Sequence, residues 1–153
     1  MNAAYVNPFL HSATLIFKQM LGQNLLRGKT SIKKSTTPGR DIAIIVGIVG
    51  SVTGQVIYSM NIETIYSIVR HLMPGIDANS LESEYRDVIG ELANMITGNA
   101  INTFLEKNTD LDLTVPQVVD TRKQTLKYKE AVSLGLNLYS EFGMLEVNVQ
   151  MDE

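Results

Sequence analysis

The chain has no cysteine among its 153 residues, which excludes disulfides, a catalytic thiol and a cysteine-based metal site. Its only histidines, His11 and His71, form no Glu-x-x-His or His-x-x-x-His pair, so we expect no transition-metal site made by the protein alone. The longest apolar run, Ile42 to Val49, is too short to span a membrane, and no signal-peptide pattern stands at the N-terminus. We therefore expect a soluble, cytoplasmic protein.

An excess of positive charge is also lacking. The chain carries 13 Lys and Arg against 16 Asp and Glu, a net charge of −3, so it lacks the strong basic footprint that usually accompanies nucleic-acid binding. The hydrophobic content of 44% and the charged content of 19% are ordinary for a globular protein. Composition and length together predict one domain over residues 1–153 with no nucleic-acid partner.

Hydrophobic periodicity, turn residues and helix-stop signals predict the order helix, three strands, two helices, three strands. The expected helices cover 7–21, 62–73 and 81–107, and the expected strands cover 25–34, 42–49, 55–60, 111–119, 126–139 and 144–151. Residues 1–60 and 81–151 thus form two similar halves, a faint internal repeat. Because hairpins rather than crossovers link the strands, we predict an α+β fold with a mainly antiparallel sheet of about six strands.

Two glycine-containing segments resemble phosphate-binding loops only superficially. Residues 22–30 have the wrong glycine spacing and follow a predicted helix, whereas a phosphate loop must precede one. Gly47, Gly50 and Gly54 lie in a predicted hairpin, where no helix begins, and are interpreted as turn residues. The same region carries a basic group made of Lys29, Lys33, Lys34 and Arg40. Charged residues that protect an edge strand from pairing explain this group, and a binding surface for an anionic partner is the alternative.

The most informative segment is the predicted helix 81–107. At 100° per residue, one narrow stripe contains Glu84, Asp87, Glu91, Asn94 and Gly98, and an apolar face lies opposite. A solvated helix explains the polar stripe, but two observations favour a docking surface. First, Gly90 and Gly98 lie inside the helix, where each glycine costs about 0.5–1 kcal/mol relative to alanine. This cost suggests that another backbone or side chain must come close to the helix.

The second observation is that Ile101 and Leu105 fall close to the polar stripe, so an exposed face would carry apolar residues. The residues alone leave docking surface and solvated helix equally open.

The pattern Asp87-x-x-x-Glu91-x-x-Asn94, followed by Pro116, resembles the signature of the CheC/CheX/FliY phosphatases of bacterial chemotaxis. The surrounding residues 90–100 and the two similar halves strengthen the resemblance, which covers essentially the whole chain. The first helix has no glutamate three residues before an asparagine, so the resemblance implies one site per chain, as in CheX.

The resemblance further implies a substrate: a response regulator phosphorylated on aspartate, phospho-CheY or a similar receiver domain. It implies that Asn94 orients the attacking water and that Glu91 pairs with a lysine of the regulator. Asp87, Gly98 and Ile101 would contact the partner. No cofactor is expected on this chain, because the regulator supplies Mg²⁺, and a homodimer is expected. The alternatives are a receiver-binding module without catalysis and a dimerising scaffold.

Overall fold

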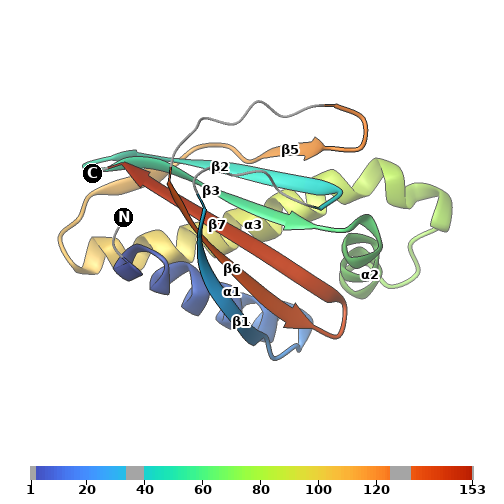
Figure 1. Cartoon of the computed structure of the whole chain (residues 1–153). Coiled ribbons are helices and arrows are strands. Elements are labelled where there is room, and N and C mark those ends of the chain that lie inside the picture. The colour runs from blue at the N-terminus through green and yellow to red at the C-terminus, as the bar shows by residue number, and fades with distance from the viewer. Residues whose placement is uncertain (1–2, 34–39, 125–131, 153) are drawn as a thin grey trace.

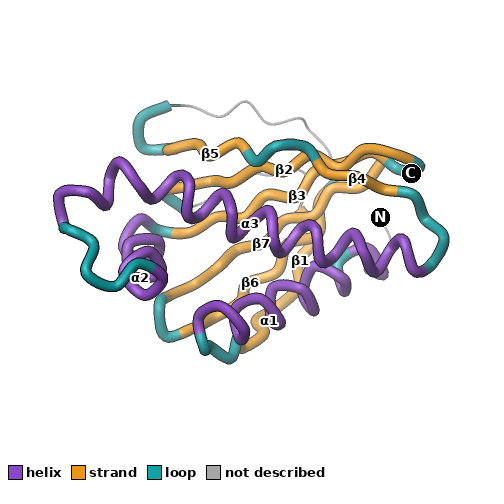
Figure 2. Tube along the Cα trace, turned by 180° about the vertical axis from the view of Figure 1, so that it is seen from behind, coloured by secondary structure: helices purple, strands orange, loops and turns teal. Residues whose placement is uncertain are grey.

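The computed structural model describes residues 3–33, 40–124 and 132–152. Its α-helices are α1 (Asn7–Leu21), α2 (Ile62–Leu72) and α3 (Leu81–Glu106). Its strands are β1 (Leu26–Lys33), β2 (Ile42–Gly50), β3 (Thr53–Met60), β4 (Leu111–Leu113), β5 (Gln117–Asp120), β6 (Ser133–Ser140) and β7 (Gly143–Asp152). The helices α1 and α3 cross one face of the sheet, and α2 packs at the end of the strands (Figures 1 and 2).

One antiparallel sheet joins both halves of the chain. Its order is β1-β6-β7-β3-β2-β4, and β5 also pairs with β2. In this order β1 corresponds to β4 and β5, β2 corresponds to β6, and β3 corresponds to β7; exchanging them gives the same order read backwards. The faint sequence repeat therefore corresponds to a pseudo-twofold arrangement about the β3–β7 pair. The predicted α+β fold with an antiparallel sheet is confirmed. The predicted strand 111–119 is two strands, β4 and β5, interrupted at residues 114–116, so the described residues form seven strands instead of six.

The core forms between the sheet and the helices. Alternate residues of β2 point toward the helices and are fully or almost fully buried: Ile42, Ile44, Val46 and Ile48. The apolar face of α1 is buried at Phe9, Ala13, Ile16 and Phe17, whereas Met20, on the same face by helical spacing, is 40% exposed. Gly22 ends α1 in the left-handed conformation at φ 64°, as a C-terminal glycine should.

Two of the glycines that we interpreted as turn residues lie inside strands. A β-carbon on Gly54 would lie 2.0 Å from the backbone oxygen of Gln150 on β7, and one on Gly47 would lie 2.8 Å from Thr114 Oγ1. These glycines therefore permit close approach of neighbouring chain, and the turn interpretation was wrong for both. Gly50, at φ 127°, does stand where β2 turns toward β3.

The basic group near the first strand falls partly outside the described residues. Lys34 lies outside them, and so do residues 35–39 between the first two predicted strands and residues 126–131 of a predicted strand. Strand β1, which carries Lys29, does stand at an edge of the sheet. Over the described residues, none of the helices has both the length and the apolar character needed to cross a membrane.

Candidate functional site

The helix α3 presents the polar stripe as the sequence predicts. Its predicted apolar face is buried at Ile89, Leu92, Ala93, Ile96 and Ala100, each at most 3% exposed. This burial directs the opposite stripe away from the core, so Asp87 and Glu91 are exposed and Asn94 is half-buried. A helix of 26 residues packed in this way is a stiff support for side chains.

Buried hydrogen bonds fix α3 from behind. The hydroxyl groups of Tyr58 and Thr97 are 2.8 Å apart, and Thr97 also donates to the backbone oxygen of Ala93 at 2.8 Å. Ser12 of α1 donates to the backbone oxygen of Ile96 at 2.5 Å. Because these polar contacts lie in the core, rotating α3 about its axis would leave buried groups unpaired, which holds the stripe in one orientation.

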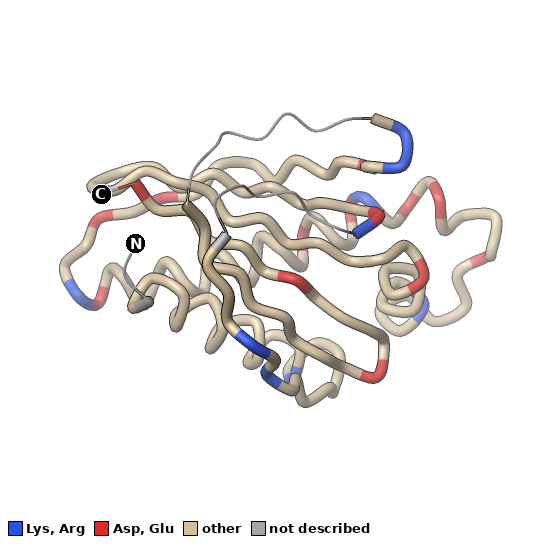
Figure 3. The backbone as a smooth tube through the Cα atoms, viewed as in Figure 1, with Lys and Arg blue, Asp and Glu red and all other residues tan. Residues whose placement is uncertain are grey.

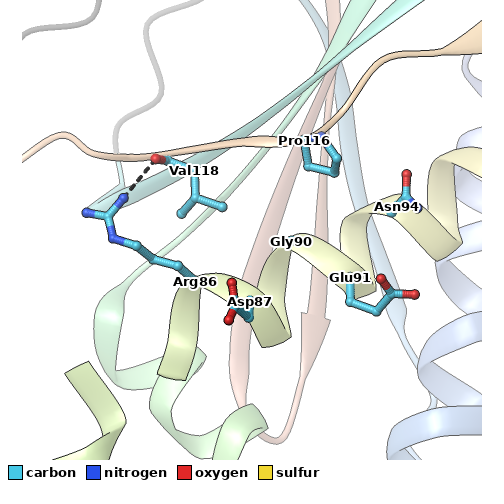
Figure 4. A pocket seen from close by; sticks show the side chains of 7 residues that line it. All are labelled: Arg86, Asp87, Gly90, Glu91, Asn94, Pro116 and Val118. Atoms are coloured by element: carbon cyan, nitrogen blue, oxygen red, sulfur yellow. Dashed lines mark hydrogen bonds between the residues drawn. The ribbon is translucent and has the colours of Figure 1, made fainter. Parts of the chain in front are cut away.

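The stripe borders an open groove of about 350 Å³ between α3 and the segment that leads into β5. Figure 4 shows the residues that line it: Arg86, Asp87, Gly90, Glu91, Asn94, Pro116 and Val118. The structure thus brings three of the predicted site residues, Asp87, Glu91 and Asn94, to one groove. Pro116, which follows them in the sequence pattern, stands on the opposite wall of that groove.

The amide of Asn94 carries an unused hydrogen-bond acceptor. Its Oδ1 is inaccessible to solvent and has no hydrogen-bond partner among the described residues. Buried polar atoms are nearly always paired, so an exception calls for an explanation. An amide offers an acceptor oxygen and donor nitrogen side by side, which suits it to holding a water molecule in one orientation.

The groove wall opposite α3 is tied to its surroundings at two points. Thr114 Oγ1 accepts a hydrogen bond from the Gly47 backbone N–H at 2.8 Å. The Thr114 backbone N–H donates to the Gly47 oxygen at 2.9 Å. At the other end, Arg86 Nη1 donates to the backbone oxygen of Val118 at 2.9 Å (Figure 4). Sequence reasoning missed Arg86 and Val118. A bond from a side chain to a backbone oxygen 32 residues away has no local sequence signal.

The structure corrects the predicted surroundings of Gly98 and Ile101. Ile101 is only 4% exposed and belongs to the core, so the prediction that it lies on an exposed apolar face was wrong. Strand β4 packs on this side of α3, and a β-carbon on Gly98 would lie 3.8 Å from Leu113 Cδ2 of that strand. Leu105, at 44% exposed, does lie at the surface. Neither Gly98 nor Ile101 lines the groove.

A charged cluster stands beyond the Arg86 end of the groove, and the turn after β5 that contributes to it is basic (Figure 3). Asp120, 1% exposed, accepts from Arg122 Nε and Nη2 at 3.0 Å each, and this pairing lowers the pKa of its carboxyl. Tyr66 donates to Glu82 at 2.6 Å, and that bond, with smaller contributions from burial and nearby charge, raises the pKa of the phenol to about 12. Among the described residues, no three His, Asp or Glu side chains gather closely enough to hold a metal ion.

Comparison with known proteins gives a consistent result. Residues 42–136 match the family model described as chemotaxis phosphatase CheX. The chain is 29% identical over 142 residues to the CheY-P phosphatase CheX of Thermotoga maritima, covering 92% of both chains. It is 28% identical to the crystal structure of chemotaxis protein CheX from Vibrio vulnificus, with a TM-score of 0.85 over 98% of this chain and 100% of that one.

A chain of the CheX–CheY–BeF3–Mg²⁺ complex from Borrelia burgdorferi is also 28% identical, with a TM-score of 0.77 over 97% of this chain and 98% of that one. The family match covers more than half of the sequence and contains the whole of α3 with Pro116 and β5. This protein belongs to the CheX family of chemotaxis phosphatases.

Proposed function

We propose that this protein hydrolyses the aspartyl phosphate of a phosphorylated response regulator, a CheY-like receiver domain. The reaction transfers the phosphoryl group to water: the water oxygen attacks phosphorus, the bond to the aspartyl oxygen breaks, and aspartate and inorganic phosphate are released. The receiver supplies Mg²⁺ and a lysine, so the phosphatase must contribute mainly a positioned water. Family membership and the relative that forms a complex with CheY support this proposal.

Asn94 is the residue proposed to orient the attacking water. The observation that carries this role is its unpaired Oδ1 in a groove that also holds two carboxylates. Because Oδ1 is buried, the carboxamide would have to turn this oxygen into the groove to accept a hydrogen bond from the water, while Nδ2 donates another. Because the amide is carried on a buried, hydrogen-bonded helix, little ordering remains to be done when the partner arrives.

Glu91 is proposed to pair with the receiver's lysine and so fix the register of the two proteins. It stands three residues before Asn94, one helical turn away, and its carboxylate is exposed, as an intermolecular ion pair requires. Asp87 extends the same acidic surface one turn further. Gly98 and Ile101 stay predictions as partner contacts, and for Ile101 the contact would require exposure of a residue that is buried in this chain.

The test uses CheY encoded in the same genome, phosphorylated with acetyl phosphate and Mg²⁺, and follows phosphate release above the receiver's own hydrolysis. Asn94→Ala should lose about 100-fold of the acceleration, as expected for losing alignment of a reactant. It should still bind CheY carrying beryllofluoride. Asn102→Ala is the matched control, because Asn102 is exposed on α3 and lies outside the groove. Full activity in Asn94→Ala would contradict the mechanism.

Binding of the beryllofluoride-bound receiver without any acceleration by the wild-type protein would instead identify a receiver-binding module. The scaffold alternative predicts that Glu91→Lys disrupts self-association. The expected homodimer is a separate prediction, checked by light scattering of the wild-type protein. A cytoplasmic location is part of the same proposal, because the reaction requires contact with the receiver domain.

A further inference from the structure

The wall of the groove opposite Asn94 is a short segment, residues 114–116, that belongs to neither neighbouring strand. Residues 114–116 separate β4 from β5, so no regular strand pairing holds them. Pro116 itself has no backbone N–H to donate. The segment is held at its two ends: Thr114 bonds to Gly47, and β5 pairs with β2 and bonds through the Val118 oxygen to Arg86.

Arg86 is held in place for this contact. Its Cζ lies 5.4 Å from the centroid of the Tyr85 ring, which is itself fully buried, so the guanidinium rests on a fixed aromatic surface. Among the described strands, β5 pairs only with β2, and the Val118 oxygen bonds to Arg86 instead of to another strand. In the described part of the chain, this is the one hydrogen bond that joins α3 directly to β5.

Gly90 of α3 and Val118 of β5 face each other across the groove. Gly90 has no side chain there, and a β-carbon at that position would lie 3.7 Å from Val118 Cγ2. Pairing with β2 sets the place of β5 in the sheet, and the Arg86 bond ties β5, with Pro116 directly before it in the chain, to α3. Asn94 lies across the groove from Pro116, and its side chain is half-buried (Figure 4).

We propose that Arg86 is a positioning residue for catalysis: by holding the Val118 carbonyl it keeps the Pro116 wall beside Asn94 and so restricts the amide to one orientation. The inference rests on the proposed phosphatase function. It differs from a role in partner binding, because an arginine that contacted an acidic group of the receiver would act on affinity. A positioning residue acts on the rate within the complex.

The experiment compares Arg86→Met and Arg86→Lys with the wild type, using CheY encoded in the same genome and phosphorylated as above. Methionine keeps an apolar stem over Tyr85 but removes the donors, so kcat should fall about tenfold while KM stays within twofold. Lysine retains one donor able to reach the Val118 carbonyl and should restore kcat to within threefold of wild type. Arg70→Met on α2 is the matched control, because Arg70 is exposed and does not line the groove.

Thr114→Val gives a second, independent variant at the other end of the wall. It removes the side-chain bond to Gly47 and should produce the same loss of kcat at unchanged KM. The side-chain amide signals of Asn94 in NMR spectra, assigned by their absence in Asn94→Ala, should shift or broaden in both Arg86→Met and Thr114→Val.

A rise of KM at constant kcat in Arg86→Met would overturn the inference in favour of a receiver contact. Unchanged kinetics together with unchanged Asn94 signals would overturn it outright. These failures are distinguishable from failure of the proposed function, because in that case the wild-type protein would not accelerate phosphate release at all.

Discussion

Replacing Gly54 by alanine should destabilise the protein strongly, because Gly54 lies where the two halves of the sheet meet. Its β-carbon would stand 2.0 Å from the Gln150 oxygen and 2.9 Å from Met151 Cα. Both are backbone atoms, so β3 and β7 would have to separate by more than about 1 Å to restore ordinary contact distances. Overpacking of this kind costs about 1–3 kcal/mol, and a rigid backbone obstacle places the expected loss near the upper end, about 3 kcal/mol.

For a chain of this length, about 3 kcal/mol corresponds to a fall in Tm of about 6–12 °C. Urea unfolding followed by circular dichroism measures the free energy of unfolding, and the m-value should not change if the native surface is preserved. The matched control is Gly98→Ala, where the new β-carbon would meet Leu113 Cδ2 at 3.8 Å, an ordinary contact. That variant should gain about 0.5–1 kcal/mol from helix propensity. A loss below about 1 kcal/mol in Gly54→Ala would refute the close approach of β3 and β7.

Three further predictions concern buried polar contacts and the site. Thr97→Val should lower the free energy of unfolding, measured in urea, by about 1–3 kcal/mol, because it leaves the buried Tyr58 hydroxyl unpaired. Tyr58→Phe should cost less, since Thr97 keeps its bond to the Ala93 oxygen. Pairing with Arg122 lowers the folded-state pKa of Asp120, so its stabilising contribution is present above the unfolded pKa, about 4, and is lost as pH falls through the folded pKa. The stability difference between wild type and Arg122→Met should therefore be largest near neutral pH and shrink below about pH 4, and a difference independent of pH would contradict the pairing. Glu91→Gln should raise KM for phosphorylated CheY several-fold and weaken its salt dependence, whereas an unchanged KM would exclude the proposed ion pair.

Sequence periodicity predicted the orientation of α3 because one of its faces is strongly apolar and the rule of 100° per residue holds along a regular helix. The same rule gave the angular position of Ile101 correctly. It did not indicate which neighbouring element covers that angle, and β4 packs there and buries the side chain. Angular position on a helix is thus a local property, whereas exposure depends on topology.

The wall of the groove was predicted only in part. Residues 111–119 have the composition of one strand, with Pro116 as an irregularity. The strands β4 and β5 are separated where Thr114 bonds through its Oγ1 and its backbone N–H to Gly47, a residue 67 positions away in the sequence. The roles of Gly47 and Gly54 were missed for the same reason, since close approach between distant strands leaves no mark in the local pattern.

The position of β7 at the centre of the sheet has a consequence for how the molecule assembles. Gln55 on β3 and Gln150 on β7 form a hydrogen bond across 95 residues of chain, so the pairing that unites the halves is also among the most distant in sequence. A nascent chain that has not yet released residues 143–152 from the ribosome would leave both β3 and β6 without a neighbour on one side. Loop closure over such a separation is slow, and the open strand edges invite pairing with other chains until β7 inserts between β3 and β6.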